Sequence, residues 1–192
     1  MKEIKILGRG GQGVVSASAV LASALFKDGY FSQAFPMYGV ERAGGPARAF
    51  VRVDTKPIER YDQVYAPFIM VVIDPSTLKE EIESELETAG FMLVNTTKSE
   101  KELRKELNLK QTCVLRTIDA TKIAMTVIGK PFANIPLIGA LAGATGIVSL
   151  KALDAAIEET WQDKGQKVVK MNQAAVKKGY ELLSKEKHLV RI

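Results

Sequence analysis

Residues 3–24 read EIKILGRGGQGVVSASAVLASA, and this stretch decides how the chain folds. A short strand is expected over Glu3–Leu7, a glycine loop over Gly8–Gly13 and a helix over Val14–Ala24. The first, third and sixth residues of the loop are glycines, which gives the G-x-G-x-x-G spacing between a strand and a helix. The alanines and serines of the helix are small enough to let it lie close to a sheet.

The glycine loop has the chemistry of an anion site. Gly8, Gly10 and Gly13 permit positive φ angles and let the backbone approach a phosphate without a Cβ in the way. The helix that follows offers free N–H groups and a partial positive charge at its start. A tight strand-to-helix turn that binds nothing is the alternative that the motif alone leaves open.

Two common nucleotide sites are disfavoured. A phosphate loop of the Walker type needs Lys-Ser or Lys-Thr after its last glycine, whereas Val14-Val15 follows here, so nucleotide hydrolysis is not expected. A dinucleotide fold carries an acid about 20 residues past the loop, at the end of the second strand. The second strand, Tyr30–Pro36, has no such acid, since Asp28 precedes it and Glu41 lies well beyond. NAD binding is therefore weakly supported.

The composition predicts a single α/β domain that spans residues 1–192. The chain is 46% hydrophobic and 26% charged, which is enough for a sizeable core. Its formal net charge of +5 and pI near 9.2 favour an acidic partner or a phosphorylated ligand. No basic run is interleaved with aromatic residues, so nucleic acid is not an expected partner.

Cysteine and histidine are scarce. Cys113 and His188 are the only ones in the chain, so no disulfide framework, cysteine-bound iron–sulfur cluster or zinc site is expected, and we predict no metal site. Cys113 lies in an apolar run and is expected in the core, whereas His188 is expected in a solvated tail. The chain begins directly with a strand and without a signal peptide, which favours the cytoplasm.

One long apolar stretch, Ile135–Leu150, needs a separate interpretation. It is shorter than the about 20 residues of a membrane span and is interrupted by proline and glycine, so no membrane association is expected. A buried helix is the better prediction, with Asn134 as its N-cap. Gly139 and Gly143 stand four apart, on one helix face, and allow a close neighbour.

Strands and helices alternate along the rest of the chain. Ala47–Val53 alternates and predicts a strand with one apolar face beside an antiparallel neighbour, whereas the continuously apolar Phe68–Ile73 predicts a central parallel strand. Further strands are expected over residues 91–95 and 113–118, and further helices over residues 79–88, 99–109, 122–128, 148–164 and 168–185. This order predicts a three-layer, Rossmann-like α/β fold with a mostly parallel sheet and an antiparallel strand.

Few other segments carry functional signals. The loop Met37–Pro46 combines an acid, a base, a double glycine and a proline, which is typical either of a functional loop or of a flexible connector. Asp74 follows the central strand, where ligands often bind, but capping of the next helix by Asp74 or Ser76 is the favoured interpretation. No catalytic motif is present, so no catalytic residue is predicted in this chain.

Several blocks of sequence resemble the gamma subunit of 2-oxoacid:ferredoxin oxidoreductases, and they cover nearly the whole chain. In order they are Gly8–Val14, Gln33–Pro36, Gly39, Glu41-Arg42, Gly44, Pro46, Ala49–Arg52, Asp119–Ala124, Ala133-Asn134, Leu141-Ala142, Ala144–Gly146, Asn172 and Gly179–Glu181. Such a series of blocks is far more specific than one glycine motif. The blocks Gln33–Pro36 and Ala49–Arg52 look more like the pyruvate or branched-chain enzymes than the 2-oxoglutarate enzymes.

The resemblance implies a subunit of a larger oxidoreductase. That enzyme oxidatively decarboxylates a 2-oxoacid, transfers the acyl group to coenzyme A and reduces ferredoxin. Thiamine diphosphate with Mg and the iron–sulfur clusters would lie in the alpha, beta and delta partner subunits. The gamma subunit would be the Rossmann-like part that helps to bind coenzyme A, without a complete active site of its own.

The resemblance also implies site residues. The diphosphate of coenzyme A would be bound by Gly8, Arg9, Gly10, Gly11, Gln12 and Gly13. The thiamine-bearing subunits or the pantetheine arm would be faced by Glu41, Arg42, Gly44 and Gly45. Coenzyme A needs no acid on its ribose 2′-hydroxyl, which agrees with the missing acid after the second strand.

One departure from the single-chain relatives concerns the phosphate charge. Those relatives resemble this chain but place a basic residue in the helix after the loop, where Ser16, Ser18 and Ala19 stand here. The charge would then come from Arg9, from Arg42 or from another subunit. Two alternative functions stay open: a stand-alone nucleotide-binding module, and a purely structural assembly subunit with an empty loop.

Overall fold

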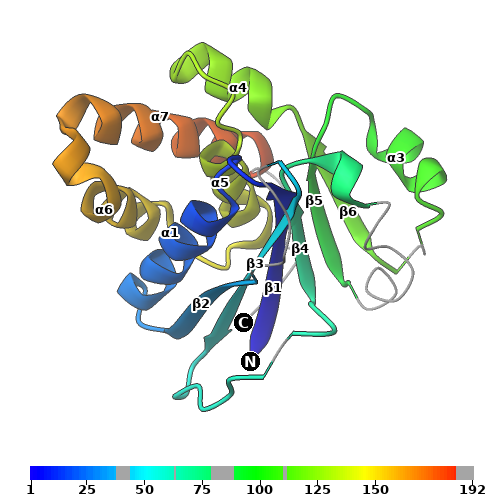
Figure 1. Cartoon of the computed structure of the whole chain (residues 1–192), viewed down its shortest axis with the longest axis horizontal. Helices are drawn as coiled ribbons and strands as arrows, with labels where there is room; N and C mark the ends of the chain where they lie inside the picture. The colour runs from blue at the N-terminus through cyan, green and yellow to red at the C-terminus, as the bar shows by residue number, and fades with distance from the viewer. Residues whose placement is uncertain (38–43, 63, 79–88, 110–111, 185–192) are drawn as a thin grey trace.

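A six-stranded sheet forms the centre of the protein. The computed structural model describes residues 1–37, 44–62, 64–78, 89–109 and 112–184. The sheet order is β2-β3-β1-β4-β5-β6 (Figure 1). The strands are β1 (Lys2–Arg9), β2 (Phe31–Met37), β3 (Pro46–Asp54), β4 (Ile69–Val72), β5 (Phe91–Asn95) and β6 (Val114–Ile118).

The sheet is mixed, with one strand reversed. Strands β1, β4, β5 and β6 pair in parallel, whereas β3 runs antiparallel to both of its neighbours, β1 and β2. The parallel strands carry continuous apolar runs because helices cover both of their faces. The prediction of a mostly parallel sheet with an antiparallel strand is therefore confirmed.

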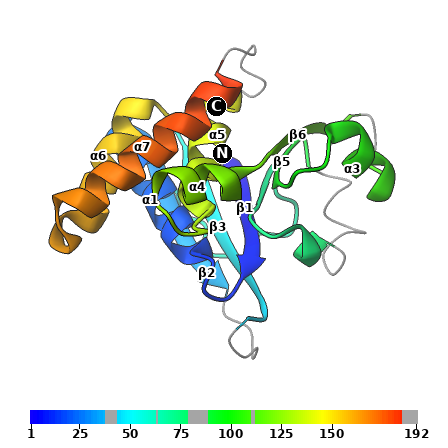
Figure 2. The same ribbon diagram turned by 90° about the horizontal axis from the view of Figure 1, so that it is seen from above.

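Helices lie on both faces of this sheet, so the predicted three layers are confirmed (Figures 1 and 2). One buried cluster joins the sheet to α1, α5, α6 and α7, and a second, smaller cluster joins the opposite face to α3. The helices are α1 (Val14–Lys27), α3 (Glu100–Glu106), α4 (Ala120–Val127), α5 (Asn134–Thr145), α6 (Leu150–Trp161) and α7 (Gln166–Leu183), with the short 3-10 helices η1 (Pro75–Thr77) and η2 (Gln162–Lys164).

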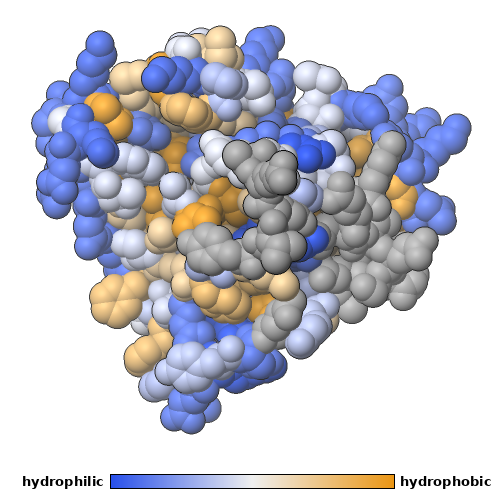
Figure 3. All heavy atoms as spheres, in the orientation of Figure 1, coloured by the Kyte–Doolittle hydropathy of each residue, from blue (hydrophilic) through white to orange (hydrophobic). Residues whose placement is uncertain are grey.

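The outer sides of the helix layers carry mostly hydrophilic residues. Figure 3 shows a mainly hydrophilic surface over the outer sides of α6 and α7 and over α3, with apolar atoms gathered near the middle of the same face. Cys113 is buried, as predicted, and burial raises the pKa of its thiol. The helix expected over residues 79–88 and the tail around His188 lie outside the described residues. Within the described part of the chain, no helix is both long and apolar enough to span a bilayer.

Helices α5 and α7 pack backbone against backbone. A Cβ built on Gly139 would lie 2.0 Å from the Val176 carbonyl oxygen, and one on Gly143 would lie 2.4 Å from the Tyr180 carbonyl oxygen. From the other side, a Cβ on Gly179 would lie 1.9 Å from the Pro136 carbonyl oxygen. Gly139 and Gly143 thus admit the close neighbour that their spacing predicts, and that neighbour is α7.

Strand β3 is buried on both faces, although its alternation predicted one apolar face. Val51 and Val53 join the larger core, and the Arg52 side chain on the other face is 0% exposed. The Arg52 guanidinium donates to Glu3 Oε1 at 2.9 Å and to the backbone carbonyls of Arg60 at 3.1 Å and Asp62 at 2.6 Å. A return segment of the chain therefore covers what sequence alone marked as the polar side.

Among the described residues, Asp154 on α6 has a buried side-chain oxygen, Oδ1, without a hydrogen-bond partner. Burial raises the pKa of this carboxyl, and the Lys177 charge offsets only part of the effect. Ionisation of Asp154 is thus harder in the folded protein than in the unfolded chain, so its charge costs stability.

Asp154→Asn is expected to raise the free energy of unfolding at neutral pH. Because the pKa is raised on folding, the penalty is absent below the unfolded pKa and grows as the pH rises through the folded value. The variant should therefore flatten the loss of stability that sets in as the pH rises above the unfolded pKa of an aspartate, about 4. Urea denaturation at several pH values measures this, with the exposed Asp163→Asn as control. If the free energy of unfolding depended on pH in the same way in wild type and Asp154→Asn, the ionised Asp154 carboxylate would not be the source of the penalty.

Candidate functional site

The loop between β1 and α1 needs glycine at two positions for conformational reasons. Gly11 has φ 92° and Gly13 has φ 78°, in the left-handed region that other residues rarely adopt. Gly13 is the N-cap of α1 and provides no side chain to cap it. Within the described chain, the backbone N–H groups of Gly11, Gly13 and Val14 have no acceptor. These donors are free to bind a ligand.

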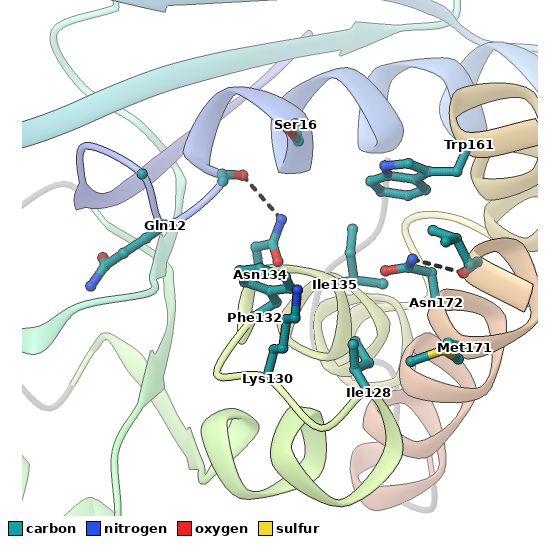
Figure 4. A pocket seen from close by; sticks show the side chains of 13 residues that line it. Gln12, Ser16, Ile128, Lys130, Phe132, Asn134, Ile135, Trp161, Met171 and Asn172 are labelled. Atoms are coloured by element: carbon teal, nitrogen blue, oxygen red, sulfur yellow. Dashed lines mark hydrogen bonds between the residues drawn. The ribbon is translucent and has the colours of Figure 1, made fainter. Parts of the chain in front are cut away.

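Gln12 holds the shape of the loop. Its Oε1 accepts a hydrogen bond from the Arg9 backbone N–H at 2.7 Å, and its Nε2 donates to Asp74 Oδ2 at 2.8 Å. In Figure 4 the Gln12 side chain points away from the other labelled residues. Gln12 thus connects the loop to the end of β4, and its side chain serves structure in this arrangement.

Arg9 extends on the same side of the loop as Gln12. Its guanidinium donates to Ser76 Oγ at 3.0 and 2.8 Å and to the Gly44 carbonyl at 3.2 Å. It also lies 3.7 Å from Asp74 Oδ2, close enough for an ion pair. The guanidinium is therefore already engaged within the chain, in a network that closes this side of the loop.

Asp74 provides the negative charge of this network. It caps the short 3-10 helix η1 by accepting from the Ser76 backbone N–H at 3.0 Å, whereas the helix that Asp74 or Ser76 was predicted to cap lies outside the described residues. Burial by itself raises the pKa of Asp74, but hydrogen bonds from Ser76 and Gln12 and the charge of Arg9 outweigh that effect, and the pKa lies below its usual value. An ionised carboxylate on this side leaves the opposite side of the loop as the better place for an anion.

The second glycine segment meets the first. The Gly10 N–H donates to the Gly45 carbonyl at 2.9 Å, and a Cβ on Gly10 would lie 3.1 Å from the Gly44 nitrogen. The structure therefore brings Gly44 and Gly45 against the loop, although 34 residues separate Gly10 from Gly44. Glu41 and Arg42 lie outside the described residues.

Asn134 approaches the loop from α5, and here the prediction was wrong. The helix includes Asn134 as its first residue, and its N-cap is Ala133, which already has helical dihedrals. The Asn134 Nδ2 instead donates to the Gly13 carbonyl at 3.2 Å. A Cβ on Gly13 would lie 2.4 Å from that nitrogen, so Gly13 and Asn134 require each other.

A pocket of about 330 Å³ opens beside the loop, and Asp74 is not among the residues that line it (Figure 4). The start of α1, the segment between α4 and α5, the end of α6 and one face of α7 enclose it. The lining residues are Gly11, Gln12, Gly13, Ser16, Ile128, Lys130, Phe132, Asn134, Ile135, Trp161, Val168, Met171 and Asn172.

Lys130 is the basic residue that the sequence did not identify. It is exposed, lines the pocket, and carries its Nζ 5.8 Å from the centre of the Phe132 ring. The helix after the loop contributes only Ser16 as a polar side chain to the pocket. No local signal marks Lys130, because it lies far from the loop in sequence and reaches it only through the fold.

Comparison with known proteins gives this site a context. A sequence profile of the family "Pyruvate ferredoxin/flavodoxin oxidoreductase" matches residues 3–182. The chain belongs to this family. The resemblance predicted from the sequence blocks is thereby confirmed.

The curated relatives in this family match over nearly their full length. The chain is 45% identical to the pyruvate/ketoisovalerate oxidoreductases common subunit gamma of Thermococcus kodakarensis, over 95% of this chain and 100% of that protein. It is 46% identical to the pyruvate synthase subunit PorC of Methanosarcina barkeri, over 82% of this chain and 85% of that protein.

Solved structures of the family share the fold. The pyruvate oxidoreductase subunit PORC of Thermotoga maritima superposes with a TM-score of 0.80 at 39% identity, over 94% of this chain and 95% of that one. The 2-oxoglutarate:ferredoxin oxidoreductase of Magnetococcus marinus, solved with 2-oxoglutarate, coenzyme A and succinyl-CoA bound, gives a TM-score of 0.77 at 19% identity. This chain corresponds to 32% of that longer protein and shares its fold there.

Proposed function

We propose that the chain is the gamma subunit of a 2-oxoacid:ferredoxin oxidoreductase of the pyruvate or ketoisovalerate type. The full-length matches to subunits with these names support the assignment. The complete enzyme would decarboxylate a 2-oxoacid oxidatively, form an acyl-CoA and reduce ferredoxin. Thiamine diphosphate, Mg and iron–sulfur clusters would belong to the alpha, beta and delta subunits.

Within that enzyme, the glycine loop would bind the diphosphate of coenzyme A. The N–H groups of Gly11, Gly13 and Val14 support this proposal, because they have no acceptor among the described residues and lie beside an open pocket at the start of α1. On the opposite side, Arg9 and Asp74 are already paired. The diphosphate would therefore lie on the pocket side of the loop.

Lys130 would supply the positive charge that the helix after the loop lacks. Lys130 lines the same pocket as Gly11 and Gly13. Because the Lys130 side chain is exposed, its ammonium stays hydrated in the free protein and would bind a phosphate at the pocket by a charged hydrogen bond. The pantetheine arm would leave toward the other glycine segment, Gly44-Gly45, and the partner subunits. Glu41 and Arg42 would face the same partners or the arm.

Lys130→Glu is expected to raise the KM for coenzyme A by at least about tenfold, since a charged hydrogen bond to phosphate is lost and a repulsive charge takes its place. The variant is assayed in the complex with its partner subunits. Lys122→Glu on α4, an exposed lysine outside the pocket, makes the same charge change and should leave this KM unchanged. Equal coenzyme A kinetics for both variants would contradict the diphosphate site.

The same complex separates the two alternative functions. A purely structural subunit predicts that neither lysine variant changes the KM for coenzyme A, while both still assemble. A stand-alone nucleotide-binding module predicts submicromolar nucleotide binding by the isolated chain in calorimetry, without any partner. The proposed function predicts that the KM effect of Lys130→Glu appears in the assembled enzyme.

A further inference from the structure

We propose that a groove between α4 and α7 docks an acidic, amphipathic helix of a partner subunit. The inference rests on the proposed function, in which this chain is one subunit of a larger enzyme, and it adds a surface through which the chain is held there. The groove is separate from the pocket beside the glycine loop. Among the described residues, Met171 alone lines both of them.

The groove follows one side of α7. Helix α4 packs beside α7 (Figures 1 and 2), and a hollow of about 480 Å³ lies where the end of α4 meets the first half of α7. Its lining residues are Val127, Gln166, Lys167, Lys170, Met171 and Ala174. The residues from α7 recur every three to four positions, so they form one stripe along the helix. A hollow between two helices, with such a stripe along one wall, has the shape that receives a third helix.

The groove has an apolar floor and a charged rim. Val127 and Met171 are half-buried, and Ala174 leaves the floor low at the far end. Methionine adapts its shape to an apolar partner, which makes it common at binding surfaces. Lys167 and Lys170 are exposed and stand at the rim. An apolar centre with a polar rim is the usual anatomy of a protein–protein interface, so the docked helix needs an apolar side chain for the floor.

The charge of the rim decides the chemistry of the partner. No aspartate or glutamate lines the groove, and α7 carries none between Gln166 and Tyr180. Within the described part of the chain, neither Lys167 nor Lys170 has an ion-pair partner, whereas Lys27 on α1 pairs with Glu159 at 2.8 Å. Interfaces juxtapose opposite charges, so the helix that fits this rim carries carboxylates on both sides of its apolar residue.

The two lysines also stand where the helix itself disfavours them. The N-cap of α7 is Gly165, which provides no side-chain cap, and no acidic residue lies in the first turn. Lys167 therefore meets the positive end of the helix dipole, and Lys170, three residues on, repels it. Conflicts between local preference and sequence are expected at functional sites. Carboxylates of a docked partner would offset both repulsions.

A second copy of this chain fits the groove less well. Symmetric contact through this surface would place the lysine rim of one copy against that of the other. The chain also carries a formal net charge of +5, which opposes self-association. The charges therefore favour a different, acidic chain over another copy.

Cross-linking of the assembled enzyme tests which chain occupies the groove. A carbodiimide joins a lysine amine directly to a carboxylate that it contacts. We expect Lys167 or Lys170 to be joined to an aspartate or glutamate of a partner subunit, as identified by mass spectrometry of the digested complex. Links from these lysines only to this chain, or only to another copy of it, would overturn the proposal.

Charge reversal tests the contribution of the rim. Lys167→Glu combined with Lys170→Glu should raise the dissociation constant of this chain from the rest of the enzyme at least about tenfold, as measured by native mass spectrometry on dilution. The control combines Lys151→Glu with Lys178→Glu, two exposed lysines outside the groove, and should leave that constant unchanged. Equal constants for the two double variants would refute the docking site.

The wild type separates this inference from the proposed function. If the wild-type chain does not assemble with the subunits of a 2-oxoacid:ferredoxin oxidoreductase, the proposed function fails. If it assembles and the rim variant assembles equally well, the proposed function stands and the groove is not a docking site.

Discussion

Gly179→Val is expected to lower the free energy of unfolding by at least about 3 kcal/mol, which is a large share of the about 5–15 kcal/mol of a typical domain. A Cβ at this position would lie 1.9 Å from the Pro136 carbonyl oxygen and 3.1 Å from the Ala140 nitrogen. Both are backbone atoms of a fully buried helix, so no side chain can rotate away to make room. The clash can be relieved only if α5 and α7 move apart.

The matched control is Ala174→Val, an exposed position on the same helix. It introduces the same β-branched side chain and should cost only the helix propensity difference, about 0.5–0.7 kcal/mol. Urea denaturation followed by circular dichroism compares the two variants. Similar midpoints would show that α5 and α7 are not in the contact described here.

The same contact sets the width of the ligand pocket. Asn134 and Ile135 come from α5, while Met171 and Asn172 come from α7, and the glycine crossing fixes the distance between these pairs. A milder substitution, Gly139→Ala, would press on Val176 and move the two walls apart. Packing far from the loop therefore bears on binding at the loop.

Arg52→Ala is expected to have the second large effect, a loss of about 3–5 kcal/mol in the free energy of unfolding. The Arg52 side chain is 0% exposed and lies 5.1 Å from the centre of the Phe35 ring. Its removal leaves the Glu3 carboxylate and the carbonyls of Arg60 and Asp62 without their buried donor. The loss comes from removing the fully buried guanidinium and the three hydrogen bonds that it donates.

Two controls isolate the cause. Arg52→Lys keeps the charge but loses the planar fork of donors, so its cost should be intermediate. Arg60→Ala removes an exposed arginine paired with Asp62 and should cost less than about 1 kcal/mol. Thermal unfolding of the three variants ranks their losses in the free energy of unfolding. A loss for Arg52→Ala no larger than that for Arg60→Ala would mean that the buried network is not formed.

The parts of the fold that sequence could predict are those specified locally. The strand, the glycine loop and the helix of residues 3–24 follow one another directly, and their apolar and glycine patterns are sufficient to place them. The Gly139 and Gly143 spacing likewise predicts a close neighbour, because both residues share one helix face. The same local pattern does not say which helix approaches them.

The parts that sequence could not predict depend on distant segments. Asn134 has the composition of an N-cap, but its side chain turns to Gly13, which is 121 residues away. Lys130 reaches the pocket only because the fold brings the segment between α4 and α5 beside the start of α1. The alternation around Arg52 predicts one polar face, but only the fold shows that a return of the chain at Arg60 and Asp62 covers that face.

The anchoring of the loop has a consequence for folding. Gly10 is fixed by Gly45, Gln12 by Asp74 and Gly13 by Asn134, so three remote segments must dock before the loop takes its native shape. Such non-local contacts form late, after the cost of closing long loops is met. The unfolded chain therefore has no anion site to offer. A ligand that binds at the loop binds only the native state. Raising the concentration of that ligand therefore raises the melting temperature of the whole domain.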